Sequence, residues 1–465
     1  MSTKESWSGT WTGATGAAAS WWDRAAGGRE VLNLALPLIL STASWAIMHF
    51  VDRMFLFWRS PVDTAAALSA GTILWTVLGL PLGIASYLNT FVAQYFGAGR
   101  PQRIGQVLFQ GVLFSWATVP LFLVLIPVSD VAFGWLGHDP VLAQRESIYF
   151  QVNCWGAGAA VLAGAYAGFY TGRGMTRTVM LIDVASSLIN VALDYLLIFG
   201  AFGFPEWGIA GAAWATVAAQ WTKVLIYLLL LRARDLRREF GIDEGRRLDR
   251  DLLRRLIRFG VPNGFQMQLE GLAFTIFVIY VARLGTLASA STTLAISINV
   301  VAFVPMIGLG IAISTLVGQH LGADQPRLAA QAVWSGLLIS LVYNGIFGLL
   351  YVLAPELFLL AHSAGSSETD TQVIRETTIV LLRFVAGYCL FDAIQLTFCC
   401  AIKGAGDTRF VLWTTFTTSA LAVTLIEWGV SWQAWGLMWC WTVLLLWIVL
   451  LAFIYSARFL HGGWT

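Results

Sequence analysis

The sequence predicts an all-α polytopic membrane protein whose twelve transmembrane helices form two six-helix lobes related by a pseudo-two-fold axis. Three observations support this fold class: the composition, the length of the apolar segments and an internal repeat. Of the 465 residues, 58% are hydrophobic and only 12% are charged, and the mean hydropathy is +0.72. A soluble domain carries about a quarter charged residues. Lipid is therefore the expected solvent for most of the chain.

The apolar segments are long enough to cross a bilayer. Seven charge-free runs each reach the roughly 20 residues that a spanning helix needs. These runs are 31–51, 64–99, 104–129, 147–172, 284–323, 328–355 and 428–457. The stretches 175–232, 259–282, 373–402 and 407–430 are equally apolar but carry one or a few charges. Together these segments predict twelve spans.

The spans divide the chain into domains. We expect a disordered cytoplasmic tail at 1–28, because its residues lack the basic region, short apolar core and cleavage site of a signal peptide. The N-terminal lobe then covers 29–232, a solvated cytoplasmic linker 233–251, the C-terminal lobe 252–460 and a short tail 461–465. All five cysteines lie in apolar segments without metal-ligand spacing, so no redox role is expected.

Basic residues predict the orientation in the membrane. An even number of helices places both termini on the same side. The tails and alternate loops on that side hold 21 of the 28 Lys and Arg residues, among them Lys403, which we assign to a cytoplasmic loop. By the positive-inside rule both termini are cytoplasmic, and we expect a multi-pass protein of the cytoplasmic (inner) membrane.

An internal repeat relates the two halves. The segment Val92–Pro101 returns as Val317–Pro326 at an offset of 225 residues. The segment Gly172–Arg177 returns as Gly404–Arg409 at an offset of 232. Similar offsets across separate helices predict a duplicated architecture. Because each half holds six spans, both halves enter the membrane in the same direction and should be related by an axis along the membrane normal.

Two acids lie at the same depth in the second lobe. Glu270 follows Arg258 by twelve residues. Asp392 precedes Gly404 by twelve residues. At 1.5 Å per residue each acid lies about 18 Å from the same surface, near the middle of the bilayer. A charge at that depth is costly, so each acid is a functional candidate.

Amide side chains accompany this pair. Asn263, Gln266 and Glu270 are spaced i, i+3 and i+7, which places them on one stripe of a helix. Gln395 lies one turn from Asp392. The spacing predicts a polar pocket, with Asn263, Gln266 and Gln395 as secondary candidates.

The first lobe has its own set of polar residues. Asp183, Asn190 and Asp194 are spaced by seven and four residues and share one helical face. Asp194 lies 17 residues beyond Arg177, and Asp52 ends the first span near its outer side, so this pair should lie in the outer half of the membrane. Asp183 lies near the cytoplasmic end of its helix, where capping of the helix dipole is an alternative to a role in transport.

The chemistry of the first-lobe set suits a small cation or a proton. Asp52, Asp194, the amide of Asn190 and a hydroxyl such as Thr216 offer the oxygen ligands that a hard cation prefers. Desolvation favours the protonated form of a carboxyl, so the same groups suit a proton. The residues alone do not distinguish between a metal cation and a proton as the bound ion. Hydrogen bonding that only cross-links the helices is the structural alternative.

These residues resemble the multidrug and toxic compound extrusion (MATE) family over residues 29–460. The resemblance rests on Pro37 with Asp52, Gln94–Pro101, Gly172–Arg177, Asn190 with Asp194, Gly208–Thr216, the spacing from Pro262 to Glu270, and Asp392 ahead of Gly404. The last two features are similar to the NorM-like branch. Arg53 departs from the family, which commonly has a small polar residue there, and we expect Arg53 to pair with Asp52.

The resemblance implies secondary active efflux of organic cations or other xenobiotics by antiport with Na⁺ or H⁺, through alternating access between the lobes. It implies ion binding, including Na⁺, at Glu270 and Asp392 in one lobe and at Asp52, Asn190, Asp194 and Thr216 in the other. We expect a monomer in the lipid bilayer, with no cofactor besides the coupling ion and no nucleic-acid partner.

Three other functions remain as alternatives. A lipid-linked precursor flippase of the same superfamily would need a large basic central cavity, which the sequence does not indicate. A membrane-embedded enzyme would need a catalytic constellation or a metal motif, and we find none. A non-transporting membrane scaffold would not need intramembrane acids. The repeat does not duplicate those acids: Glu270 corresponds to Trp45, and Asp52 corresponds to Phe277.

Overall fold

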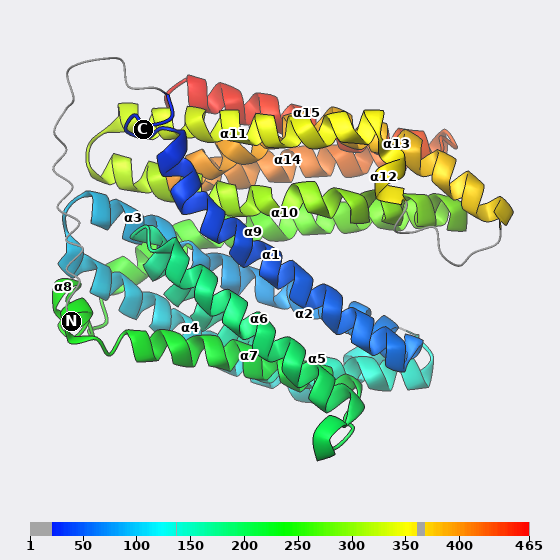
Figure 1. The fold of residues 1–465 in the computed structure, drawn as a ribbon, viewed down its shortest axis with the longest axis horizontal. Coiled ribbons are helices and arrows are strands. Elements are labelled where there is room, and N and C mark those ends of the chain that lie inside the picture. The colour runs from blue at the N-terminus through cyan, green and yellow to red at the C-terminus, as the bar shows by residue number, and fades with distance from the viewer. Residues whose placement is uncertain (1–20, 136, 360–367, 465) are drawn as a thin grey trace.

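The computed structural model describes residues 21–135, 137–359 and 368–464, and all regular structure within these ranges is helical (Figure 1). Six spans form the N-terminal half: α1 (Gly28–Arg59), α2 (Pro61–Ser86) continued by α3 (Leu88–Gly97), α4 (Pro101–Trp135), α5 (Pro140–Gly172), α6 (Thr176–Phe199) and α7 (Ile209–Leu230). The three-residue helix Ala201–Gly203 lies between α6 and α7.

The C-terminal half repeats this arrangement. Its spans are α9 (Arg250–Arg283), α10 (Thr286–Gly322), α11 (Pro326–Leu353), α13 (Glu368–Ala405), α14 (Thr408–Glu427), which a π-helical turn extends to Trp432, and α15 (Leu437–Leu460). Two short helices, α8 (Arg234–Glu239) and α12 (Pro355–Leu359), lie in connections.

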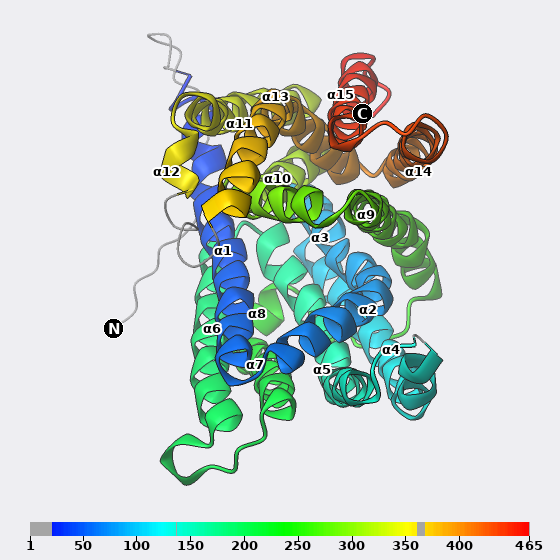
Figure 2. The same ribbon diagram turned by 90° about the vertical axis from the view of Figure 1, so that its right-hand side faces the viewer.

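The predicted twelve-helix membrane fold is confirmed. Within the described residues, eleven helices are long and apolar enough to cross a membrane. The helix α5, with 33 residues, packs between α2, α4 and α7 and completes six spans in the first half. Figure 2 shows the two halves as separate groups of helices that meet along α1, α2, α9 and α10.

Local sequence signals define several helix starts. Pro61, Pro140 and Pro326 occupy the first helical turn, where the missing N–H costs no hydrogen bond. Asp139 and Asp249 precede α5 and α9, and their carboxylates accept hydrogen bonds from the N–H groups of Val141 and Leu252.

The lobes meet most closely at one end of the bundle. We call it the basic end; it carries the C-terminal residues and the connections 98–100, 173–175, 231–249, 323–325 and 406–407. These connections and the helix ends next to them hold most of the Lys and Arg residues. The Gln94 amide donates to the Gly404 carbonyl at 3.2 Å, and the Gln319 amide donates to the Gly172 carbonyl at 2.9 Å. Each bond joins one lobe to the other, so the repeated segments exchange equivalent bonds.

Interlobe bonding stops partway along the bundle. The bonds furthest from the basic end run from Gln268 to the Thr76 carbonyl and from Thr42 to the Val304 carbonyl. Gln268 is eighteen residues past the basic-end start of α9. In the described part of the chain, no interlobe hydrogen bond or ion pair lies beyond these two. The lobes are therefore bonded at the basic end and through the middle, but not at the opposite end.

The helix α1 is shared between the lobes. Its first half and the preceding Ala26 belong to the apolar core of the second lobe, together with residues such as Met306 and Trp464. The Ser335 hydroxyl also donates to the Ala26 carbonyl at 2.8 Å. Near its other end, Leu56 belongs to the core of the first lobe.

Two boundary expectations need correction. Residues 21–27, assigned to a disordered tail, form turns packed against the second lobe, whereas residues 1–20 lie outside the described ranges. The linker 233–251 is not simply solvated: Phe240 and Ile242 are buried in the core of the first lobe. The Phe240 carbonyl accepts from the N–H of Gly105, and the Gln110 amide donates to the Arg247 carbonyl at 2.9 Å. Of the tail at 461–465, Trp464 stacks on Phe459, and Thr465 lies outside the described ranges.

Candidate functional sites

The two first-lobe acids lie together in the interior. Asp52 of α1 is 4% exposed and Asp194 of α6 is fully buried. The two carboxyl groups are close enough for their charges to interact. The Oδ1 atom of each has no hydrogen-bond partner among the described residues. Buried polar atoms are ordinarily bonded, so these two oxygens are available to a ligand.

Asn190 connects this pair to α7. In the amide orientation that satisfies both of its groups, Asn190 donates to Asp194 Oδ2 at 3.0 Å and accepts from the backbone N–H of Thr216 at 3.2 Å. The expected contribution of Thr216 was a hydroxyl ligand. The contact that the structure records is made by the Thr216 backbone, which positions the amide next to Asp194.

The helix α5 adds a tyrosine to the same site. Tyr149 is 7% exposed, and its phenol lies close enough to Asp52 and Asp194 to interact with both charges. Asn153, one turn further on, is buried and donates to the Tyr149 carbonyl at 2.9 Å. Neither residue was a candidate from the sequence. The available signal was the spacing of four between a tyrosine and an amide inside a span.

The expected pairing of Arg53 with Asp52 is wrong. Arg53 is exposed; its charge acts on Asp52 through space, but no hydrogen bond or ion pair joins the two side chains in the described part of the chain. Consecutive helical residues point about 100° apart, so a buried acid and its neighbour face different surroundings. Asp52 is thus not neutralised by direct contact with Arg53.

Asp183 has a separate structural environment. Its Oδ1 atom pairs with the Lys223 ammonium of α7 at 2.9 Å, and its Oδ2 atom accepts from the Ser41 hydroxyl of α1. It is the eighth residue of α6, so the alternative of helix capping is wrong. Both oxygens are bonded, in contrast to those of Asp194, and the pair joins α1, α6 and α7.

The second-lobe acids also lie together. Glu270 of α9 and Asp392 of α13 are close enough for their charges to interact. The Oε1 atom of Glu270 is buried without a partner among the described residues. Gln266 and Gln395 are buried on the same two helices. The two acids therefore interact across the interior of the second lobe, and two buried amides lie on the same helices.

Asn263 does not join this group. Its amide donates to the Gly83 carbonyl of α2 at 2.7 Å and so links the lobes. A Cβ atom at Gly83 would lie 2.5 Å from the Gly264 backbone, which shows how closely α2 and α9 approach. The predicted polar stripe is therefore divided between an interlobe contact and the acid pair.

Lys403 was wrongly assigned to a cytoplasmic loop. It lies within α13, and its ammonium donates to Gln266 Oε1 at 3.1 Å. Its charge also acts on Glu270. The second acid pair thus has a basic neighbour that the loop assignment concealed.

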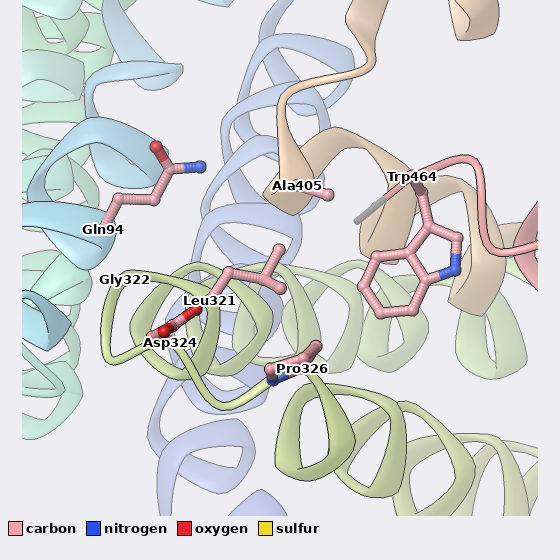
Figure 3. Close-up of a pocket in the computed structure, with 7 residues that line it drawn as sticks. All are labelled: Gln94, Leu321, Gly322, Asp324, Pro326, Ala405 and Trp464. Carbon is pink, nitrogen blue, oxygen red and sulfur yellow. The ribbon is translucent and has the colours of Figure 1, made fainter.

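A cavity of about 360 Å³ lies at the basic end, at the seam between the lobes (Figure 3). It is lined by Gln94 of the first lobe and by Leu321, Gly322, Asp324, Pro326, Ala405 and Trp464 of the second. None of the four acids lines it. The cavity marks the closed seam of the lobes and is separate from both acid pairs.

Two segments, 37–196 and 262–428, match the MatE family model. The chain belongs to the MatE family. The two segments contain both acid pairs, and the resemblance inferred from the sequence is confirmed.

Relatives of this MatE protein extend along its length. It is 28% identical over 380 residues to a probable multidrug resistance protein NorM of Xanthomonas axonopodis pv. citri (strain 306), which covers 81% of each chain. Among solved structures, an outward-facing multidrug resistance MATE family transporter superposes with a TM-score of 0.84 at 18% identity, covering 97% of this chain and 100% of the other. A MOP superfamily transporter from Pyrococcus furiosus superposes with a TM-score of 0.82 at 18% identity, covering 95% and 97%.

Proposed function

We propose that this MatE protein exports organic cations or other xenobiotics in exchange for the inward movement of Na⁺ or H⁺. The observation that carries the proposal is the buried pair Asp52 and Asp194, each with an unpartnered carboxyl oxygen inside a membrane span. Intramembrane carboxyls of this kind typically carry ions or protons. The NorM relative, described as a probable multidrug resistance protein, supports the substrate class.

The proposal includes an orientation. The basic end carries most Lys and Arg residues, and the positive-inside rule makes it cytoplasmic. Both tails then lie in the cytoplasm of a multi-pass protein in the cytoplasmic membrane, acting as a monomer. Because the lobes are bonded at this end and not at the opposite one, we assign the conformation to the outward-facing state.

The acid pairs supply the coupling. In the outward-facing state the open carboxyl oxygens bind Na⁺ or a proton from outside, and the oxygen-rich surroundings of both pairs fit either ion. Binding lowers the affinity for a cationic substrate, which leaves to the outside. The ion drives transport only to the extent that it binds the two states with different affinities. Rocking of the lobes then breaks the contacts at the basic end and returns the site to the cytoplasm.

Purified protein in proteoliposomes tests this function. We expect efflux of a fluorescent organic cation when an inward Na⁺ or proton gradient is imposed, and none without a gradient. Replacement of Asp392 by Asn should abolish efflux without unfolding the protein. Glu356→Gln, an exposed acid paired with Arg375 at the opposite end, is the matched control and should transport normally.

Three outcomes would contradict the proposal. Equal efflux with and without both gradients excludes antiport. Normal efflux by Asp392→Asn excludes a role for the second pair. Transfer of a lipid-linked precursor in the absence of cation efflux would instead favour the flippase.

A further inference from the structure

The Lys403 side chain turns toward the protein interior, unlike most lysine side chains at a helix end. It is two residues from the end of α13, at the basic end, where lysine side chains ordinarily extend to water and to the helix dipole. Its ammonium instead turns inward to Gln266 Oε1 at 3.1 Å. Its carbonyl accepts a hydrogen bond from the Tyr87 hydroxyl of the first lobe at 3.0 Å. The backbone is thus anchored at the lobe seam while the charge faces the interior.

The ammonium lies on a polar path to the acid pair. Gln266 precedes Glu270 by one turn of α9, and Asp392 precedes Lys403 by eleven residues, or three turns of the same face of α13. The Lys403 charge acts on Glu270, and Cys399 and Cys400 are its other titratable neighbours. Among the described residues no carboxylate lies within ion-pair distance of Lys403. Its charge is therefore close to Glu270 without forming a salt bridge.

The repeat counterpart of Lys403 in the first lobe is not a cation. The repeat places Thr171 opposite Lys403. The intramembrane lysine of the first lobe, Lys223, is bonded to Asp183 at 2.9 Å. An inward-turned lysine is thus recorded beside the second acid pair, whereas the cation next to the first pair is the exposed Arg53.

The charge balance of the second site follows from this geometry. The ionised carboxylates of Glu270 and Asp392 together carry two negative charges, which suits a divalent cation. With the Lys403 ammonium present, the site carries one negative charge and suits one monovalent ion. Cellular Mg²⁺ and external Ca²⁺ would otherwise compete for the coupling site.

We propose that Lys403 determines the charge selectivity of the Glu270 and Asp392 site by excluding divalent cations. This inference rests on the proposed function, in which that site binds the coupling ion. Lys403 is a specificity residue in this account: it holds the site at one net negative charge and does not itself carry the transported ion.

Calcium binding to the purified full-length protein tests the exclusion without transport. We expect Lys403→Gln to bind Ca²⁺ at least about tenfold more tightly than the wild type by isothermal titration, because loss of the positive charge removes its repulsion of a divalent cation. Lys403→Arg should keep the wild-type affinity. Lys403→Gln combined with Glu270→Gln restores one net negative charge and should return the affinity to the wild-type level.

Arg383→Gln removes one positive charge from an exposed position on the same helix and is the matched control. Ca²⁺ should inhibit gradient-driven efflux by Lys403→Gln and not by the wild type. Unchanged Ca²⁺ affinity in folded Lys403→Gln, or an equal gain in Arg383→Gln, would overturn the inference. A tighter Ca²⁺ affinity in Lys403→Gln and not in Arg383→Gln, in a protein that shows no efflux, would support the exclusion of divalent cations by Lys403. The lack of efflux would then count against the proposed antiport.

Discussion

The side-chain amide of Gln94 donates a hydrogen bond to the backbone carbonyl of Gly404 in the other lobe, at 3.2 Å. Gln319, the repeat counterpart of Gln94, bonds to Gly172, the counterpart of Gly404, at 2.9 Å. Two elements of the internal repeat thus meet across the pseudo-two-fold axis. In the proposed transport cycle an inward-facing state requires both bonds to break, so they would act as a latch at the basic end.

Removal of the latch should favour the inward-facing state. Each hydrogen bond contributes about 1 kcal/mol, so Gln94→Ala with Gln319→Ala should shift the ratio of the two states by at least about tenfold. Spin labels on cysteines introduced at Arg100 and Arg327 should report a larger population of long distances. Gln372→Ala, which loses only an exposed bond to Glu376, is the control. An identical distance distribution in the double variant would show that the latch is not energetically relevant.

The close approach of the two backbones at Gly97 should also keep the lobes together at the basic end. A Cβ atom at Gly97 would lie 1.8 Å from the Gln319 carbonyl oxygen, and a backbone atom there cannot rotate away. Gly97→Ala should therefore separate the labels at the basic end even in a protein with an intact latch. Gly71→Ala, whose Cβ would meet open space, should leave the distances unchanged. Equal distances in the two variants would contradict the close packing.

Asp194→Asn should separate function from stability. Because one Asp194 oxygen is buried without a partner, replacement by a neutral amide leaves no charge unpaired and should not lower the melting temperature. Gradient-driven efflux should fall at least about tenfold, since the ion loses a binding group. Efflux assays and thermal melting on the same preparation check both statements. A lower melting temperature with retained efflux would point to a structural role.

Replacement of Asp183, unlike that of Asp194, should lower the stability of the protein. Removal of one partner of a fully buried ion pair costs about 3–5 kcal/mol, and the Asp183–Lys223 pair is largely buried, so Asp183→Asn should lower the melting temperature by leaving the Lys223 charge unpaired. Asp183→Asn with Lys223→Met removes both charges and should recover most of the loss. If the double variant is as unstable as the single one, the pair is not the source of the stabilisation.

The sequence was sufficient to predict the spans, but not to predict which lobe each segment packs against. Apolar length and the repeat were sufficient for twelve spans, because lipid requires every spanning segment to form its own hydrogen bonds. The start of α1 nonetheless packs in the second lobe, and Phe240 of the linker packs in the first. An apolar face predicts burial but does not specify which partner covers it.

The acids could be identified individually, but not all of their neighbours. Helical spacing singled out Asp194 and Asn190 because charged and amide residues are rare in spans. Tyr149 was missed because aromatic residues are common there. Lys403 was misassigned because a lysine near a helix end ordinarily faces water, and only the three-dimensional contact with Gln266 shows otherwise.

The packing of Ala26 has a consequence for biogenesis. Ala26 and the start of α1 are among the first described residues to be synthesised, yet their buried partners include Ser335 and Trp464. Contacts this distant in sequence close late, because the intervening chain must already be in place. The start of α1 therefore completes its packing only after Trp464 is in place, and deletion of residues 461–465 should expose the segment around Ala26 to proteolysis.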